Sequence, residues 1–294
     1  MKGLRIKANG VDYFVIVQGE GAPLLLLHGF TGSHRTWLPF ISHWSKRYKV
    51  IALDIIGHGQ TESPAEVALY SMAEVSKSIR DILDVLGIDK VSVLGYSMGG
   101  RLGLYFALHY TERINGLILE SASPGLASKE AREVRIQKDT TLSQKIEENG
   151  IEAFVDNWEK IPLFFTQKHL PKVMKNAIRK ERLQHQPIGL ANSLRGMGTG
   201  RQPSLWEALA DFQVSVPVLL VAGEKDKKFL NIAQEMKRKL PMSFLVVFRR
   251  AGHTLHVEVA GKFDKIVYDE FYRMIEYREG GMLDDDSMED RSYI

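Results

Sequence analysis

Short apolar runs alternate along the chain with longer segments in which apolar residues recur every three or four positions. The runs lie at residues 24–27, 50–53, 91–94, 116–119, 216–221 and 243–248. Such runs are typical of buried strands, whereas the three-to-four spacing, clearest at 71–86 before Gly87, predicts helices. Buried strands that alternate with helices indicate a parallel sheet covered on both faces. The predicted fold class is therefore α/β, with a mostly parallel, doubly wound sheet.

Other segments extend this pattern toward both ends of the chain. Residues 4–8 and 13–17 predict two strands that Asn9 and Gly10 join in a hairpin, because this dipeptide favours the tight turn between antiparallel strands. Further helices are expected at 37–48, 98–110, 229–240 and 257–277.

The short apolar runs typical of strands are absent for about eighty residues in the middle of the chain. Residues 124–204 are charged, helical in pattern and interrupted by Pro162, Pro171, Pro187 and Pro203. We interpret this segment as a helical cap inserted into a core domain formed by 1–123 and 205–278. Residues 279–294 are acidic and poor in core-forming side chains, so we expect a disordered tail there.

Composition and charge narrow the classes of function. The 294 residues include no cysteine, which excludes disulfides, thiolate metal sites and a cysteine nucleophile. No apolar run approaches the roughly 18 residues of a membrane span, and the first ten residues lack a signal-peptide core, so a cytoplasmic location is expected. Residues 124–204 hold 14 Lys and Arg against 9 Asp and Glu. This modest excess favours a small anionic ligand over nucleic acid.

A glycine-rich motif, GYSMGG at 95–100, lies between a predicted buried strand and a predicted helix. A G-x-S-x-G sequence in this context is typical of a nucleophile elbow, in which a strained turn exposes the serine hydroxyl above the sheet. The alternative is a glycine-rich turn with an ordinary serine. The motif makes Ser97 the candidate nucleophile or base.

An acid and a histidine follow in the turns after two later strands. Asp226 lies in GEKDKK and His253 in AGH, and the chain order serine, aspartate, histidine is that of α/β-hydrolases. The imidazole takes the serine proton, and the carboxylate orients the imidazole. Glu224 competes with Asp226 for the acid role. His256 competes with His253, but we interpret it as a structural or pocket-wall histidine.

Two backbone N–H groups are candidates for an oxyanion hole. One belongs to Met98, directly after Ser97, and the other to Phe30, which follows the His28-Gly29 pair at the end of a buried strand. Plain turn chemistry is the alternative for that pair. His58, in the loop 57–61, fits neither a phosphate-binding nor a zinc-binding spacing, so we interpret it as structural.

Arg101 lies one turn after Ser97 on the same predicted helix, among residues that are mostly apolar. An unpaired arginine in such surroundings is costly, which favours a ligand-binding role over a surface position.

Several motifs together resemble one enzyme family over residues 3–278. The motifs are HGFTGSHRTW, GHGQTESP, LGYSMGGRLGL, SASPGL, FVDNWEKIPLF, GTGRQPSLW, GEKDKKF and AGHTLHVE. They are similar to those of the 2-succinyl-6-hydroxy-2,4-cyclohexadiene-1-carboxylate synthases of menaquinone biosynthesis. HGF, GYSMGG and AGH occur across the α/β-hydrolase superfamily, so the arginine of GRLGL and the two cap motifs carry the specific resemblance.

The resemblance implies a lyase that eliminates pyruvate from a tricarboxylate substrate, with Ser97, His253 and Asp226 acting as a base. It implies no cofactor and no metal; the sequence leaves the oligomeric state open, with a monomer expected. By position in the family pattern, the resemblance also implies a set of substrate contacts: Arg101, Arg135, Arg182, Trp158 and Tyr96. Arg132 is an alternative to Arg135, and a solvated cap face is the alternative for Arg135 and for Arg182. An esterase, thioesterase or carbon–carbon hydrolase with the same triad, and a non-catalytic receptor of this fold, remain alternatives.

Overall fold

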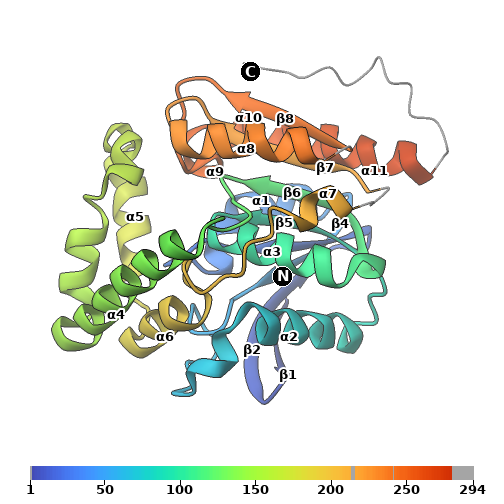
Figure 1. The fold of residues 1–294 in the computed structure, drawn as a ribbon. Helices are drawn as coiled ribbons and strands as arrows, with labels where there is room; N and C mark the ends of the chain where they lie inside the picture. The colour runs from blue at the N-terminus through green and yellow to red at the C-terminus, as the bar shows by residue number, and fades with distance from the viewer. Residues whose placement is uncertain (1, 213–215, 241, 280–294) are drawn as a thin grey trace.

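The computed structural model describes residues 2–212, 216–240 and 242–279. Within them, eight strands form one sheet in the order β1-β2-β4-β3-β5-β6-β7-β8 (Figure 1). The strands are β1 Lys2–Ala8, β2 Val11–Gln18, β3 Ala22–Leu27, β4 Tyr48–Leu53, β5 Val91–Tyr96, β6 Ile114–Glu120, β7 Val218–Gly223 and β8 Ser243–Phe248. Strands β3 to β8 run parallel, which confirms the predicted doubly wound α/β class.

The predicted N-terminal hairpin is confirmed. Strands β1 and β2 pair antiparallel from Lys2 opposite Val17 to Ala8 opposite Val11. Asn9 and Gly10 make the turn with φ values of 48° and 80°. A turn with both central residues at positive φ matches the twist of the flanking strands, and asparagine and glycine are the residues that adopt it most readily.

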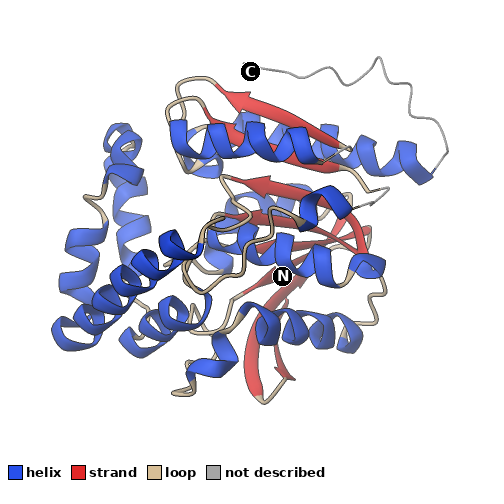
Figure 2. Ribbon diagram, viewed as in Figure 1, coloured by secondary structure: helices blue, strands red, loops and turns tan. Residues whose placement is uncertain are grey.

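Helices cover both faces of the sheet (Figure 2). Alternate residues of the buried strands point to opposite faces, and each face carries its own apolar core. Leu25 and Leu27 pack on the face covered by α2 Met72–Val85, α3 Met98–His109 and α8 Lys227–Lys239. Leu24 and Leu26 pack on the other face. That face is covered by α1 Leu38–Trp44, α10 Ala260–Lys265, the π-helical segment η5 Ile266–Phe271 and α11 Tyr272–Glu279.

Two predicted helices differ from those observed. The helix expected at 37–48 is a short 3-10 turn, η1 His34–Trp37, followed by α1. The helix expected at 257–277 is divided into α9 Leu255–Glu258, α10, η5 and α11. Val259 leaves the helical conformation at φ −138° and ψ 42°. The Glu258 carboxylate accepts hydrogen bonds from the N–H groups of Gly252 and Thr254, which anchors α9 to the preceding loop.

Four helical elements lie within residues 124–204, between β6 and α7: α4 Lys129–Trp158, η4 Pro162–His169, α5 Lys172–Arg182 and α6 Pro187–Met197. Gly150 interrupts α4 with φ 78° and ψ 177°. Pro162 and Pro187 begin η4 and α6, where a missing N–H costs nothing. Figure 1 shows α4, α5 and α6 gathered at one side of the sheet. Their assignment to a separate cap at 124–204 stays a prediction.

The remaining described helices are η2 Val67–Tyr70, η3 Thr111–Arg113 and α7 Ala208–Asp211. Over the described part of the chain, no helix combines the length and the apolar character needed to cross a bilayer. The predicted tail at 279–294 lies outside the described residues except for Glu279, which ends α11.

Candidate active site

Ser97 lies in the turn between β5 and α3, at φ 51° and ψ −104°. A non-glycine residue at positive φ carries strain, which the surrounding structure must hold. The Ser97 N–H donates to Glu120 O at 2.9 Å. A Cβ on Gly99 would lie 2.2 Å from Leu27 O, so only glycine lets the first turn of α3 approach β3 this closely. The local sequence thus folds as the predicted elbow.

The structure brings Ser97, His253 and Asp226 together at the carboxyl ends of β5, β8 and β7. His253 Nε2 lies 3.1 Å from Ser97 Oγ, and its Nδ1 lies 2.6 Å from Asp226 Oδ2. Because a carboxylate accepts, Nδ1–H donates to Asp226, and Nε2 is left to accept the serine proton. The ring of Phe229 packs at 4.6 Å from the imidazole. This geometry suits proton transfer from Ser97 to His253.

The two competitors for the triad have other partners. Glu224 accepts a hydrogen bond from the N–H of Arg250 at 2.9 Å. His256 places Nδ1 2.9 Å from both carboxylate oxygens of Glu120. Neither residue is bonded to Ser97 or to His253 in the described structure.

The two candidate oxyanion donors are the N–H groups of Met98 and Phe30. Met98 is the first residue of α3, and Phe30 follows the His28-Gly29 pair. Among the described residues, neither amide has a hydrogen-bond acceptor. Unpaired N–H groups are available to a ligand, and their assignment to an oxyanion hole stays a prediction.

Three histidines support the loop that carries Phe30. His28 donates from Nδ1 to Gly29 O at 2.8 Å and accepts from the N–H of Ile55 at 3.0 Å. Burial lowers the pKa of His28 to about 4, so this imidazole is neutral at pH 7.

His58 and His185 continue the same stack of rings. His58 lies 5.2 Å from the His28 ring and 5.3 Å from the His185 ring. His185 Nε2 donates to Thr31 O at 2.9 Å, and its Nδ1 accepts from the N–H of Gly59 at 3.2 Å. Among the described residues, no group of His, Asp and Glu side chains is arranged to hold a metal ion. The stack packs beside the loop, and the structural interpretation of His58 stays a prediction.

Arg101 is buried behind the serine, with 9% of its surface exposed. Its Nη1 donates to Met197 O at 2.9 Å and to Gln202 Oε1 at 2.8 Å, neutral acceptors at the end of α6 and just after it. Burial, together with the positive charge of Arg135, lowers the pKa of Arg101 to about 10. A buried cation without a carboxylate partner is costly, which marks this guanidinium as a candidate anion site.

The cap residues differ in how well they fit a site. Arg182 is buried, stacks 4.8 Å over the ring of Phe164 and lies 3.7 Å from Glu159, and burial lowers its pKa. Arg135 is partly exposed and donates to Asp139 at 2.8 Å. Arg132 donates to two backbone carbonyls at the start of α4, which leaves Arg135 as the better candidate.

Trp158 joins the cap to the loop of the oxyanion hole. Its ring lies 5.4 Å from Phe30 and 5.9 Å from Phe164, both edge-on. The indole Nε1 is buried without a hydrogen-bond partner in the described structure. Trp158 therefore forms an aromatic wall beside Phe30.

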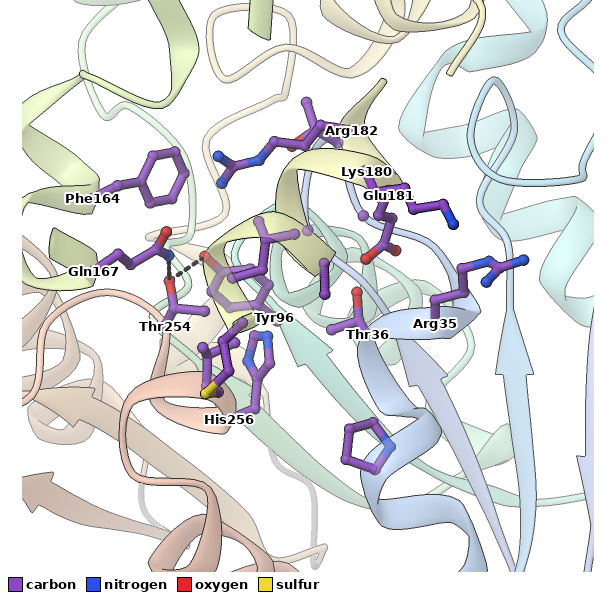
Figure 3. Close-up of a pocket in the computed structure, with 18 of the residues that line it drawn as sticks. Arg35, Thr36, Tyr96, Phe164, Gln167, Lys180, Glu181, Arg182, Thr254 and His256 are labelled. Carbon is purple, nitrogen blue, oxygen red and sulfur yellow. Dashed lines mark hydrogen bonds between the residues drawn. The ribbon is translucent and has the colours of Figure 1, made fainter. Parts of the chain in front are cut away.

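A cavity of about 530 Å³ lies between the loop 29–32, α1, η4, α5 and α9. Figure 3 shows Arg182 and Phe164 at one end of it, Arg35, Lys180 and Glu181 at the other, and Tyr96 between them. The cavity is lined by Tyr96 and Thr254, which adjoin Ser97 and His253 in the chain, and by Phe30. Ser97, Arg101, Arg135 and Trp158 do not line it.

Sequence analysis missed several polar groups that line this cavity. Gln167 donates to Thr254 Oγ1 at 2.9 Å, and Thr254 shares a hydrogen bond of 3.2 Å with the Tyr96 hydroxyl. Thr254 could have been inferred because it follows His253 directly. Nothing in the local pattern distinguishes Gln167, Arg35 or Lys180 from ordinary surface residues.

Comparisons with known proteins agree with this geometry. A family model described as alpha/beta hydrolase fold matches residues 22–260. A putative 2-succinyl-6-hydroxy-2,4-cyclohexadiene-1-carboxylate synthase of Bacillus subtilis (strain 168) is 44% identical over 262 residues, which cover 88% of this chain and 94% of that protein. The chain belongs to this synthase family, within the α/β-hydrolase superfamily.

Other members of the synthase family are more distant. The synthase of Yersinia pestis bv. Antiqua (strain Nepal516) is 30% identical over 84% of this chain and 86% of its own length. The solved structure of MenH from S. aureus matches with a TM-score of 0.84 and 34% identity, covering 91% of this chain and 98% of that one.

A solved structure with a different activity in its name also matches. It is a thermophilic esterase from Thermogutta terrifontis with malate bound, with a TM-score of 0.80 and 25% identity, and the match covers 93% of this chain and 99% of that one.

Proposed function

We propose that this protein eliminates pyruvate from 2-succinyl-5-enolpyruvyl-6-hydroxy-3-cyclohexene-1-carboxylate to give 2-succinyl-6-hydroxy-2,4-cyclohexadiene-1-carboxylate. The observation that carries the proposal is Arg101, a buried guanidinium one helical turn from Ser97 with only neutral partners. A substrate with three carboxylates supplies the missing counter-charge. A hydrolase of neutral esters does not need a buried guanidinium for substrate binding.

The triad acts as a base in this proposal. His253 accepts the Ser97 proton at Nε2, and Ser97 Oγ takes the proton from the carbon next to the succinyl ketone. The N–H groups of Met98 and Phe30 hold the enolate oxygen that forms. The electron pair then moves through the ring and expels the enolpyruvyl oxygen. No acyl-enzyme and no water take part.

Substrate binding involves the core and the cap together. Arg101 binds one carboxylate, and Arg182 and Arg135 bind the others, because guanidinium forks match carboxylates. Trp158 and Tyr96 supply the aromatic walls. Residues 124–204 act as the cap that brings Arg135, Trp158 and Arg182 to the site. A cytoplasmic, monomeric protein is part of the same proposal.

An esterase is the second candidate, because the esterase structure at 25% identity shares the fold over nearly its whole length. That activity requires Ser97 to form a covalent acyl intermediate. A non-catalytic receptor is a weaker candidate, since the hydrogen bonds from Ser97 to His253 and from His253 to Asp226 have the distances that catalysis needs.

Pyruvate release from the cyclohexene substrate tests the proposal directly. We expect wild-type protein to release pyruvate, which lactate dehydrogenase and NADH report as a loss of absorbance. Mass spectrometry of rapidly quenched enzyme should find no adduct on Ser97. Absence of pyruvate together with fast turnover of small neutral esters would reverse the order of the first two candidates.

A further inference from the structure

A second histidine–carboxylate pair lies close to the catalytic pair. His256 in α9 places Nδ1 2.9 Å from both oxygens of Glu120, the last residue of β6. Glu120 is fully buried, and its Oε1 also accepts the N–H groups of Leu255 at 2.6 Å and His256 at 3.2 Å. Because Glu120 is surrounded by donors, it acts as acceptor, and Nδ1 of His256 carries a hydrogen. The free nitrogen of this imidazole is therefore Nε2.

Nε2 of His256 opens toward the cavity. It has no hydrogen-bond partner among the described residues, yet it is not among their buried unpaired nitrogens, and His256 lines the cavity. Figure 3 shows the imidazole directly beside Tyr96. His34 and Asp54 form a buried pair of similar geometry, at 2.9 Å and 3.0 Å, but neither lines the cavity. Of these two pairs, the His256 pair alone has access to a ligand there.

The two histidines of AGHTLHVE pack against the same ring. Tyr96 is 5.5 Å from the His253 ring and 4.7 Å from the His256 ring. A substrate that lies along Tyr96 can therefore reach both the catalytic base and His256.

The cavity suits a group that carries a carboxylate. Three cations line it: Arg182, Arg35 and Lys180. Glu181 also lines it but is bonded to Ser33 Oγ at 2.6 Å, and burial raises the pKa of its carboxyl group. The cationic excess favours the enolpyruvyl arm of the substrate over a neutral group.

We propose that His256, held by Glu120, is the general acid that protonates the departing enolpyruvyl oxygen; this inference rests on the proposed function. As the ring carbon–oxygen bond breaks, its electron pair goes to the oxygen, and the Nε2 proton of cationic His256 is transferred to that oxygen. The products are neutral His256 and enolpyruvate, which becomes pyruvate by tautomerisation. His256 regains a proton from water through the open side of the cavity.

The elimination requires a proton donor for the leaving oxygen, and a second histidine can supply it. The proton from the substrate carbon resides on His253 after the base step, and His253 faces Ser97. An enolate is a poor leaving group, and protonation of a leaving oxygen by a placed acid accelerates such steps by roughly 10² to 10⁴.

His256→Asn tests this role, because the asparagine amide can occupy the position of Nδ1 and donate to Glu120 while Nε2 is removed. We expect kcat for pyruvate release to fall by about 100-fold and KM to change little. In D₂O, the recovered substrate should exchange the hydrogen next to the ketone at a rate that rises relative to elimination, because the base step survives. Glu120 and Tyr96 contact His256, and Glu258 and Arg182 act electrostatically on Tyr96.

His34→Asn is the matched control, since it removes the outer nitrogen of a buried histidine that does not face the cavity. It should leave the ratio of exchange to elimination unchanged, whatever it does to the melting temperature. If His256→Asn does not fold, the same ratio is measured on Glu120→Gln and should rise less. If the ratio of exchange to elimination is unchanged in whichever of His256→Asn and Glu120→Gln folds, the inference is overturned. Wild-type protein that neither exchanges nor eliminates would overturn the proposed function instead.

Discussion

Replacing Arg101 with methionine separates substrate recognition from stability. Methionine is unbranched, apolar and similar in length, so it can fill the buried channel of the arginine side chain. Arg101 contacts no carboxylate within ion-pair distance among the described residues, and its two acceptors, Met197 O and Gln202 Oε1, are neutral. Asp139 acts on this charge electrostatically but without a direct contact, so a ligand carboxylate would be the first one bonded to the guanidinium.

The magnitude follows from the burial of the charge. A pKa lowered from 12.5 to about 10 corresponds to roughly 3 kcal/mol of unfavourable free energy for holding Arg101 cationic. Arg101→Met removes this cost but leaves two buried acceptors unpaired, at about 1 to 3 kcal/mol. The two effects nearly cancel, so the free energy of unfolding should change by no more than about 2 kcal/mol. A charge-assisted bond to the substrate contributes up to about 3 kcal/mol, so kcat/KM should fall by roughly 150-fold.

The experiment measures the activity of two arginine variants on two substrates and their stability in urea. Arg113→Met is the control, because Arg113 also donates to backbone carbonyls, those of Asp89 and Ile88, far from Ser97 in the fold. It should lower the urea midpoint and leave pyruvate release unchanged. Arg101→Met should lower kcat/KM for pyruvate release, with only the limited change in stability given above. Its turnover of a small neutral ester, if the wild type has any, should persist. Unchanged kcat/KM for pyruvate release by Arg101→Met would refute the substrate-binding role.

Three further predictions concern the triad, the cap and acid stability. Ser97→Ala and Asp226→Asn should each lower kcat by several orders of magnitude and combine non-additively in the double variant, as single-turnover kinetics will show. Arg182→Gln should lower kcat/KM by about 2 kcal/mol, roughly 30-fold, with a smaller effect on the melting temperature because its carboxylate partner lies at 3.7 Å. The pKa of His28 is lowered from 6.5 to about 4. Only the unfolded state binds this proton between those values, so urea midpoints should fall as the pH drops from 6.5 to 4 and level off above 6.5.

The parts of the fold that sequence predicts correctly are those that depend on neighbours in the chain. The apolar runs of the parallel strands, the turn at Asn9 and Gly10 and the elbow at Ser97 each follow from a pattern only a few residues long. Ser71 caps α2 by accepting from the N–H of Glu74, another local signal.

The parts that sequence missed depend on contacts between distant segments. The break after α9 is different, because the bonds that anchor α9 join Glu258 to Gly252 and Thr254, only a few residues earlier in the chain. Gly150 is a partial exception, since a glycine in a long helical pattern favours an interruption that was not predicted. The cavity brings together α1, α5 and α9, so no local pattern could reveal Arg35 or Lys180 as its lining.

The position of Glu120 in the sequence is itself a signal of a functional site. It ends the run GLILE, so a charged residue is the last position of an otherwise buried strand. A buried carboxylate is costly unless donors surround it, and parallel strands end where active sites form. The combination predicts a partner among the groups that gather at that edge, and His256 is that partner. Because the paired imidazole keeps one nitrogen open to the cavity, a charged residue that closes a buried parallel strand is evidence for chemistry as well as for packing.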